Sequence, residues 1–221
     1  MTEIKVVENI MKLNDSVAAE VRALLAERGV FAVNLIGSPG SGKTTLLERV
    51  LPKLAPLSEM LVLEGDIATT RDAERIAAGG IEAVQITTGN ACHIAAHLIK
   101  RSLAQCDLSG RKYLLVENVG NLVCPAEFDI GEHAKIVVLS VPEGDDKPLK
   151  YPLVFQTSAL CVLTKIDLVP YTDFSIARFK QNVEAVHPGM TIIQTSLRQE
   201  GGFEEVAGWL RSERTRLGAA A

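Results

Sequence analysis

One segment of this chain matches the pattern G-x-x-x-x-G-K-[ST]. It reads Gly37-Ser38-Pro39-Gly40-Ser41-Gly42-Lys43-Thr44. The apolar residues 30–36 precede it and a helix-like run over 45–50 follows it, which is the strand–loop–helix context of a phosphate-binding loop. In such a loop, backbone N–H groups and the start of the helix bind phosphate oxygens. We expect residues 37–45, Thr45 included, to bind phosphate, with Lys43 on the outer phosphates and the Thr44 hydroxyl on Mg²⁺.

A second segment, Thr164-Lys165-Ile166-Asp167, follows an apolar run and can select the base. A carboxylate at Asp167 accepts hydrogen bonds from both N1–H and the exocyclic amine of guanine. Adenine lacks this pair of donors and would leave a buried carboxylate unpaired, a penalty of about 1–3 kcal/mol. The Lys165 stem can lie along the base plane. This T-K-x-D pattern predicts GTP and GDP as ligands and disfavours a small-molecule kinase. Ser196 and Leu197 occupy the place where GTPases contact the guanine carbonyl.

An acidic residue closes the predicted strand 112–117, and a glycine follows three positions later. This order, Glu117 and then Gly120, resembles the D-x-x-G switch of GTPases. Glu117 is predicted to bind Mg²⁺ directly or through water. The Gly120 N–H is predicted to sense the γ-phosphate, whose loss releases the loop. The next residue is Asn121 rather than the glutamine that orients water in small signalling GTPases, so we expect slow hydrolysis.

Two further carboxylates follow the predicted strand 60–64. Asp66 can orient the attacking water or hold Mg²⁺ through water. Asp72 can reach the metal from the next helix, or it is a charge favoured by the N-terminal end of that helix. The predicted catalytic residues are Lys43, Asp66, Glu117 and Gly120, and the predicted Mg²⁺ ligands are Thr44, Asp66, Asp72 and Glu117.

Two cysteines and one histidine form a separate candidate metal site. Cys92 and His93 are expected to open a helix, with Asn90 as its cap, and a helix N-terminus lowers the pKa of a thiol. Cys124 lies four residues beyond the switch glycine. Two thiolates and an imidazole suit Ni²⁺ or Zn²⁺ rather than Mg²⁺, but each residue alone is equally compatible with a structural role. The other cysteines, Cys106 and Cys161, lie in apolar patterns that predict core positions.

Six segments together resemble one family. They read GSPGSGKTTL, EGDIATTRDAER, TGNACHI, ENVGNLVCP, VPEGDDKPLKYP and LTKIDL, in this order. The chain is similar to the hydrogenase nickel-incorporation (maturation) GTPases, which belong to the signal-recognition-particle and MinD-type class of P-loop GTPases. Its phosphate loop lacks the extra N-terminal lysine of the MinD-type ATPases, because Ser38 and Pro39 occupy that region. The resemblance implies that Cys92, His93 and Cys124 are the metal ligands.

The same resemblance implies the partners. A GTP-bound homodimer would hold the Ni²⁺ or Zn²⁺ site at its interface. Loop 142–150 and residues 168–169 would lie near that interface, with Lys147 either touching the partner subunit's nucleotide or simply solvated. A small zinc-containing nickel-insertion protein would bind the N-terminal helix, and the hydrogenase large subunit would be the eventual client. Residues 1–29 contain no His and no Cys, so high-capacity nickel storage is not expected.

Two alternative functions stay open at this point. A urease-type nickel accessory GTPase is expected to carry Cys-Pro-His, whereas this chain has Ala91-Cys92-His93. A nickel or zinc storage or regulatory protein would use its nucleotide site only as a structural feature.

Apolar strands alternate with helices along the chain and position these residues. Strands are predicted over 30–36, 60–64, 82–86, 112–117, 135–141, 159–164 and 190–194. Helices are predicted over 44–54, 71–79, 91–105, 173–186 and 202–216. The alternation predicts an α/β, three-layer P-loop NTPase fold with a mostly parallel seven-stranded sheet and helices on both faces.

The predicted organisation is an N-terminal helix over 1–29 for partner contact, a single GTPase domain over 30–217 and a frayed tail over 218–221. The helical pattern covers 3–28, and Asn14-Asp15-Ser16 can interrupt it. The polar, proline-bounded loop 142–150 is predicted to lie on the surface.

Composition limits the classes of function. The chain has 221 residues, 47% of them apolar, which suits one well-filled domain. A net charge of −4 argues against a nucleic-acid surface, because phosphate backbones attract an excess of Lys and Arg. No apolar run approaches the ~18 residues of a membrane span, and the first residues lack the layout of a signal peptide. We therefore expect no nucleic-acid or membrane partner and a cytoplasmic location.

Overall fold

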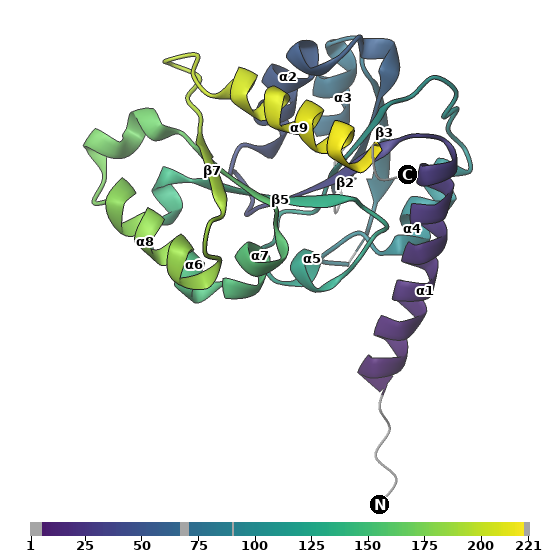
Figure 1. Ribbon diagram of the computed structural model, residues 1–221, viewed down its shortest axis with the longest axis horizontal. Helices are drawn as coiled ribbons and strands as arrows, with labels where there is room; N and C mark the ends of the chain where they lie inside the picture. The colour runs from purple at the N-terminus through teal and green to yellow at the C-terminus, as the bar shows by residue number, and fades with distance from the viewer. Residues whose placement is uncertain (1–5, 67–70, 90, 219–221) are drawn as a thin grey trace, which may run out of the picture.

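The computed structural model describes residues 6–66, 71–89 and 91–218. Within these residues, seven strands form one sheet in the order β3-β2-β4-β1-β5-β6-β7, and every neighbouring pair is parallel. Helices cover both faces of the sheet (Figure 1), which confirms the predicted three-layer α/β fold. The strands are β1 (Phe31–Ile36), β2 (Met60–Asp66), β3 (Glu82–Thr87), β4 (Tyr113–Glu117), β5 (Ala134–Ser140), β6 (Leu160–Thr164) and β7 (Thr191–Gln194).

The connections between strands are mostly helical. The α-helices are α1 (Val6–Glu27), α2 (Lys43–Leu54), α3 (Arg71–Ala78), α4 (Ala96–Leu103), α5 (Cys124–Glu127), α6 (Lys147–Lys150), α7 (Pro152–Thr157), α8 (Ile176–Val186) and α9 (Phe203–Gly218). Three short 3-10 helices, η1 (Leu57–Glu59), η2 (Val141–Glu143) and η3 (Ile166–Tyr171), complete the elements of the described residues. All seven strands lie within two residues of the predicted bounds.

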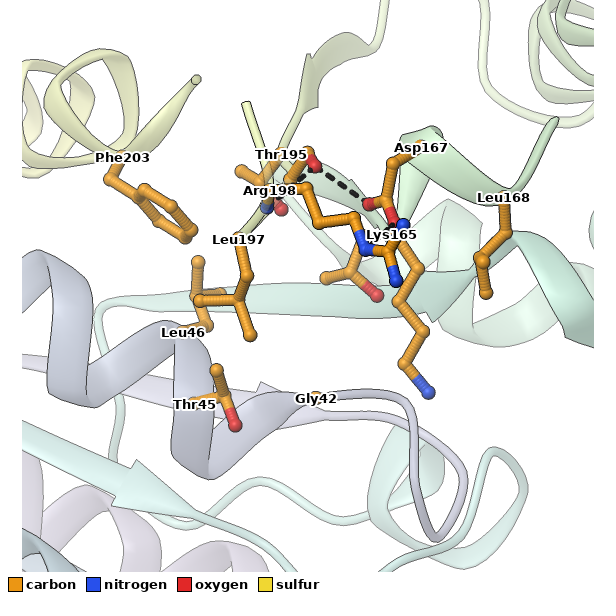
Figure 2. Close-up of a pocket in the computed structure, with 12 residues that line it drawn as sticks. Gly42, Thr45, Leu46, Lys165, Asp167, Leu168, Thr195, Leu197, Arg198 and Phe203 are labelled. Carbon is orange, nitrogen blue, oxygen red and sulfur yellow. Dashed lines mark hydrogen bonds and ion pairs between the residues drawn. The ribbon is translucent and has the colours of Figure 1, made fainter. Parts of the chain in front are cut away.

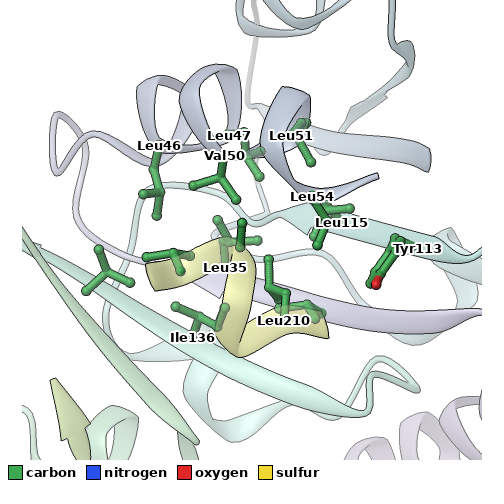
Figure 3. Packing of buried hydrophobic residues seen from close by; sticks show 14 of the residues in the cluster. Leu35, Leu46, Leu47, Val50, Leu51, Leu54, Tyr113, Leu115, Ile136 and Leu210 are labelled. Carbon is green, nitrogen blue, oxygen red and sulfur yellow. The ribbon is translucent and has the colours of Figure 1, made fainter. Parts of the chain in front are cut away.

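Alternation along the central strand β1 divides the core between the two faces of the sheet. Phe31, Val33 and Leu35 belong to a cluster with α2 and α9, shown in Figure 3, whereas Ala32 and Ile36 pack into clusters on the opposite face. A strand that is buried on both faces is apolar at nearly every position. The polar exception is Asn34, which is fully buried, so its side chain must find a partner inside the protein.

Helix α1 is continuous through Asn14-Asp15-Ser16, so the predicted interruption did not occur. The reason is that Asn14 uses its side chain for tertiary contacts instead of a local turn: it donates to the Asp129 carbonyl at 2.7 Å. Ala18, Val21 and Leu25 are buried against the body of the protein. The N-terminal turns of α1 extend beyond the other elements (Figure 1).

Loop 142–150 is more ordered than its polar sequence indicated. It contains the last two residues of η2 and all of α6, and Asp145 and Pro148 are buried. Asp145 is held by Arg178, which donates to it from Nε at 2.8 Å, whereas Leu149 is 55% exposed. The surface prediction therefore holds only in part, because a carboxylate with a charged hydrogen-bond partner can be buried. No helix in the described part of the chain is long and apolar enough to cross a bilayer.

Candidate functional site

The predicted nucleotide motifs meet at one edge of the sheet, because the carboxyl ends of parallel strands lie together there. One pocket at this edge is lined by the phosphate loop, the end of β2, the start of α3 and residues 117–120. A neighbouring pocket is lined by residues of the segments 164–168 and 195–198. Gly42, Thr45 and Lys165 line both pockets, so the two form one continuous cleft.

The phosphate loop has the backbone that its glycines allow. Gly40 and Gly42 have positive φ angles of 76° and 95°, and Gly42 begins α2 as its N-cap. The buried Lys43 ammonium donates to the carbonyl oxygens of Gly37 and Ser38 at 3.2 and 3.3 Å. Burial lowers the pKa of Lys43, while neighbouring carboxylates oppose this change. The Lys43 ammonium is therefore held inside the loop by two carbonyl oxygens, which the oxygens of a bound phosphate could replace.

Three carboxylates converge beside Thr44. The Thr44 hydroxyl donates to Glu117 Oε1 at 2.8 Å. One oxygen each of Glu64, Asp72 and Glu117 lies within 4.8 Å of the others, which suits a single divalent cation. Oxygen ligands of this kind are those that Mg²⁺ prefers, and the Thr44 hydroxyl is within reach to add a fourth.

Burial makes these carboxylates unusual acids. Desolvation raises the pKa of Glu64 to about 8, and the nearby charge of Glu117 adds to the effect. Burial raises the pKa of Glu117 to about 7, although Lys43 and the hydrogen bond from Thr44 oppose it. Glu64 Oε2 is buried without a hydrogen-bond partner among the described residues. A cation is the natural partner for such a group.

Glu64 is the functional candidate that the sequence reasoning missed. Its signal was a single charge inside the apolar strand β2, two positions before Asp66, so that both side chains lie on the same face. Glu64 and Glu117 are register partners on the adjacent strands β2 and β4. Asp66 lines the same pocket, and Asp72 also accepts a hydrogen bond from Arg75 at 3.0 Å. Asp72 is therefore placed to serve either of its two predicted roles.

The base-selecting segment is arranged around Asp167 (Figure 2). Ser196 Oγ donates to Asp167 Oδ1 at 2.6 Å, which joins the two predicted guanine segments. Lys165 has a left-handed backbone conformation, with φ of 59°, and its Nζ donates to the Gly40 carbonyl at 2.7 Å. Thr164 Oγ1 donates to the Ser41 carbonyl at 2.6 Å. These two bonds tie the end of β6 to the phosphate loop.

Apolar side chains complete the walls of the base pocket. Leu46 and Phe203 line it together with Leu197, which is 49% exposed (Figure 2). The sequence reasoning assigned Leu46 and Phe203 to helices only, because their role depends on the way α2 and α9 pack together. Apolar walls with an aspartate at one edge have the chemistry that suits a flat heteroaromatic ring.

The segment after Glu117 lies directly against the phosphate loop. Asn121 N donates to the Gly37 carbonyl at 3.0 Å, which forms an isolated antiparallel bridge. A β-carbon at Gly120 would lie 2.8 Å from Cγ and 2.9 Å from N of Pro39. Only glycine therefore permits this close approach, and Gly120 lines the same pocket as Pro39, Gly40 and Lys43.

The structure brings together the three predicted ligands of the soft-metal site. The Sγ atoms of Cys92 and Cys124 are 2.7 Å apart, and Cys92 Sγ lies 3.7 Å from His93 Nδ1. The His93 ring stacks on Phe128 with centroids 3.9 Å apart. Burial lowers the pKa of His93, which favours the neutral imidazole that a metal requires. Two thiols and an imidazole form a donor set for Zn²⁺ or Ni²⁺.

The prediction that Cys92 and His93 open a helix was wrong. Helix α4 begins at Ala96, and Cys92 and His93 lie in the irregular segment before it; Asn90, the predicted cap, lies outside the described residues. The pKa of Cys92 is raised, first by its contact with Cys124 and then by burial, and is not lowered by a helix end. The Cys92 thiol is therefore a weaker acid than an ordinary cysteine, and a bound cation would favour its thiolate form.

The remaining cysteines have structural surroundings. Cys161 is fully buried in β6, where desolvation raises its pKa. Cys106 is partly buried, packs against the cluster around α1 and α4, and donates to the Ser102 carbonyl at 3.2 Å. Both positions agree with the core assignment made from the sequence.

The parallel sheet, the phosphate loop and the aspartate-containing base pocket define the class of the protein as a P-loop GTPase. Comparison with known families agrees, since residues 31–194 match the model described as "CobW/HypB/UreG, nucleotide-binding domain". The chain belongs to this family and, within it, to the hydrogenase nickel-incorporation (maturation) GTPases. This confirms the resemblance seen in the sequence.

Individual relatives support the assignment. The chain is 44% identical over 217 residues to the hydrogenase maturation factor HypB of Azotobacter vinelandii, covering 98% of this chain and 72% of the relative. It is 42% identical to the hydrogenase/urease maturation factor HypB of Helicobacter hepaticus, covering 96% and 88%. Among solved structures, HypB from Helicobacter pylori in complex with nickel has a TM-score of 0.87 at 37% identity, covering 92% of this chain and 95% of that one.

A more distant likeness concerns the fold alone. The signal recognition particle 54 kDa protein from Aeropyrum pernix K1, in complex with GDP, has a TM-score of 0.57 at 17% identity. It covers 86% of this chain and 50% of that one. The shared fold agrees with the class that the motifs indicated.

Proposed function

We propose that this GTPase is a metallochaperone that delivers nickel during the maturation of [NiFe]-hydrogenase in the cytoplasm. Its nucleotide state would control a Cys/His metal site and the formation of a homodimer. Nickel is the cargo of this reaction, whereas GTP and Mg²⁺ supply the switch. Zn²⁺ is a competing occupant, because two thiolates do not by themselves select nickel.

One observation carries the proposal: a single short segment joins the nucleotide pocket to the metal site. Glu117 and Gly120 line the phosphate pocket, and Cys124, on the same segment, lies 2.7 Å from the Cys92 thiol. A change in the position of Gly120 therefore changes the geometry of the three soft ligands. Such a coupling of ~1–3 kcal/mol changes metal affinity by about 5- to 150-fold.

The residues of the nucleotide pocket have separate roles in this proposal. Lys43 stabilises charge on the outer phosphates, and Asp66 orients the attacking water or a water on the metal. Mg²⁺ is held by Thr44, Glu117, Asp72 and Glu64, the last added because one of its oxygens lies within 4.8 Å of oxygens of the other two carboxylates. Asp167, Lys165 and the segment 195–197 bind the guanine base. Together these groups support slow hydrolysis of GTP.

Dimerisation is supported by exposed apolar side chains, one of them adjacent in sequence to a proposed metal ligand. Val123, adjacent to Cys124, is 48% exposed, and Leu149 and Leu153 on α6 and α7 are 55% and 38% exposed. Helix α5, which follows Val123, packs against α7. The start of α1, which extends beyond the other elements (Figure 1), is the proposed contact for the small zinc-containing nickel-insertion protein, and the hydrogenase large subunit is the proposed client.

The coupling is tested by measuring Ni²⁺ affinity with GDP and with a non-hydrolysable GTP analogue. We expect the two affinities to differ at least fivefold, with the difference abolished in Lys43→Ala, which cannot hold the outer phosphates. Competition with a chromophoric chelator gives both constants. Equal Ni²⁺ affinities in the two nucleotide states of the unmodified protein would refute the proposed coupling.

The storage alternative predicts a different result. If the nucleotide site were only structural, Lys43→Ala would transfer Ni²⁺ to a hydrogenase precursor as well as the unmodified protein does. A urease-type client is a second candidate, because the relative from Helicobacter hepaticus is a hydrogenase/urease maturation factor. Transfer assays with precursors of both enzymes decide between these clients.

A further inference from the structure

Two asparagines flank the switch glycine and both bond to the segment that carries Cys92 and His93. Asn118 and Asn121 lie on either side of the pair Val119–Gly120. Asn118 is 1% exposed, whereas Asn121 is at the surface of the metal site. Asn118 lines the phosphate pocket and the Asn121 N–H bonds Gly37, but no role was assigned above to the side chains of the asparagine pair Asn118/Asn121.

Asn118 connects the switch loop to the residue after His93. Its Oδ1 accepts from Ile94 N at 3.1 Å and from its own neighbour Val119 N at 3.0 Å. Its Nδ2 donates at 3.1 Å to Oδ1 of the fully buried Asn34 on β1. A buried amide that makes all these hydrogen bonds has one favourable orientation. A displacement of the switch loop should therefore also move the Ile94 backbone that is bonded to this amide.

Ile94 is also held from the nucleotide side. Its side chain is fully buried and packs against Gly65, the residue that separates Glu64 from Asp66 in the sequence. A β-carbon at Gly65 would lie 2.7 Å from Ile94 Cγ1. The backbone N–H of Ile94 is bonded to Asn118, as described above. Ile94, the residue next to His93, therefore contacts two residues that line the phosphate pocket, Gly65 and Asn118.

Asn121 forms the second connection and reaches the two cysteines. Its Nδ2 donates to the Cys92 carbonyl at 3.3 Å, and its Oδ1 accepts from Val123 N at 2.9 Å. Val123 precedes Cys124, so one amide group fixes the backbones that carry both thiols. Neither a carboxylate nor a hydrocarbon at this position can both donate to Cys92 and accept from Val123.

We propose that Asn118 and Asn121 are positioning residues that couple the γ-phosphate switch to the metal ligands, with Asn121 setting the separation of the two thiols. The inference rests on the proposed function, since it names the residues through which nucleotide state would change metal affinity. Movement of Gly120 toward a terminal phosphate would displace both amides. Their partners, Cys92 and Ile94, enclose His93, so the soft ligands would move as a set.

The test compares the ratio of Ni²⁺ affinities in the GTP-analogue and GDP states among matched variants. We expect Asn121→Ala and Asn121→Asp to reduce this ratio by about two- to tenfold, the range that one net hydrogen bond supplies. Asn121→Asp retains the acceptor for Val123 but loses the donor to Cys92. Asn182→Ala is the control, because Asn182 on α8 likewise donates to a backbone carbonyl, that of Asp145 at 2.9 Å. The control should keep the ratio of the unmodified protein.

A second measurement covers the buried member of the pair. In metal-free protein, hydrogen exchange at the Ile94 amide should be faster in Asn118→Ala and lose its dependence on GDP or GTP analogue. Thermal unfolding and nucleotide affinity establish that each variant is folded. The inference would be overturned, and the proposed function left intact, if Asn121→Ala kept the affinity ratio of the unmodified protein. Equal losses of Ni²⁺ affinity in both nucleotide states would have the same meaning, because they leave that ratio unchanged. If the unmodified protein binds Ni²⁺ equally well in the two nucleotide states, the proposed function itself is refuted.

Discussion

Removing the charge of Glu64 should make the metal-free protein more stable at alkaline pH. In the folded chain the Glu64 carboxyl has a pKa of about 8, against an ordinary value of 4.5. Between these values the folded state holds a proton that the unfolded state has lost, so stability falls as pH rises. Above pH 8 the penalty for ionising this buried group is on the order of 5 kcal/mol. Glu64→Gln has nearly the same shape and no charge.

The assay is urea unfolding of metal-free, nucleotide-free protein in EDTA, followed by circular dichroism from pH 5 to 9. We expect similar free energies of unfolding for Glu64→Gln and the unmodified protein near pH 5, where Glu64 is protonated in the folded state. At pH 8.5 the variant should be more stable by a few kcal/mol. Glu205→Gln, at an exposed position on α9, should follow the unmodified profile. Parallel profiles for Glu64→Gln and the unmodified protein would refute this account of the buried carboxylate.

Magnesium should reverse the order. With Mg²⁺ and GDP in excess, the ionised Glu64 becomes a ligand, and ligand binding stabilises only the folded state. The unmodified protein should therefore gain more stability from Mg²⁺ and GDP than Glu64→Gln gains. An equal gain in both proteins would show that Glu64 does not contact the cation.

Three other changes give direct outcomes. Asp167→Asn replaces one acceptor with a donor, so GDP should bind about 10- to 100-fold more weakly and xanthosine diphosphate more tightly, as measured by calorimetry. Gly120→Ala places a β-carbon 2.8 Å from the phosphate loop and should lower stability by about 1–3 kcal/mol, whereas Gly208→Ala, whose β-carbon meets nothing closer than 3.8 Å, should not. Diamide should join Cys92 to Cys124, with a mass loss of two hydrogens, and bound Zn²⁺ should prevent this; an oxidation rate unaffected by metal would contradict a shared site.

The nucleotide motifs were predictable because each consists of residues close together in sequence. The segments 37–44 and 164–167 carry their own backbone requirements, such as positive φ at Gly40 and Gly42, and the strand–helix alternation placed them at the same sheet edge. Strand bounds followed from apolar runs that are buried on both faces. These features depend on local pattern and on the handedness rule for parallel connections.

Contacts between distant segments were not predictable in this way. The role of Glu64 depends on the pairing of β2 with β4, which places it beside Glu117. The hydrogen bond from Ile94 N to the Asn118 side chain depends on the way two loops distant in sequence pack together. The predicted helix over 91–105 was too long because the apolar spacing of α4 extends to residues that precede its true start at Ala96. The residue before it, Ala95, offers no side-chain cap, so no local signal marked the boundary.

The missing cap is supplied by another helix. Asn14 Oδ1, on α1, accepts from Ala96 N at 3.0 Å, so the first turn of α4 is closed by a side chain 82 positions earlier in the chain. The same asparagine also bonds Asp129, which Arg22 pairs at 2.7 Å. A protein shortened to remove α1 would therefore lose more than the proposed partner contact, because the backbone that leads from His93 into α4 would lose its anchor. A change in metal affinity in such a truncation would therefore reflect a loosened scaffold as well as the loss of the proposed partner contact.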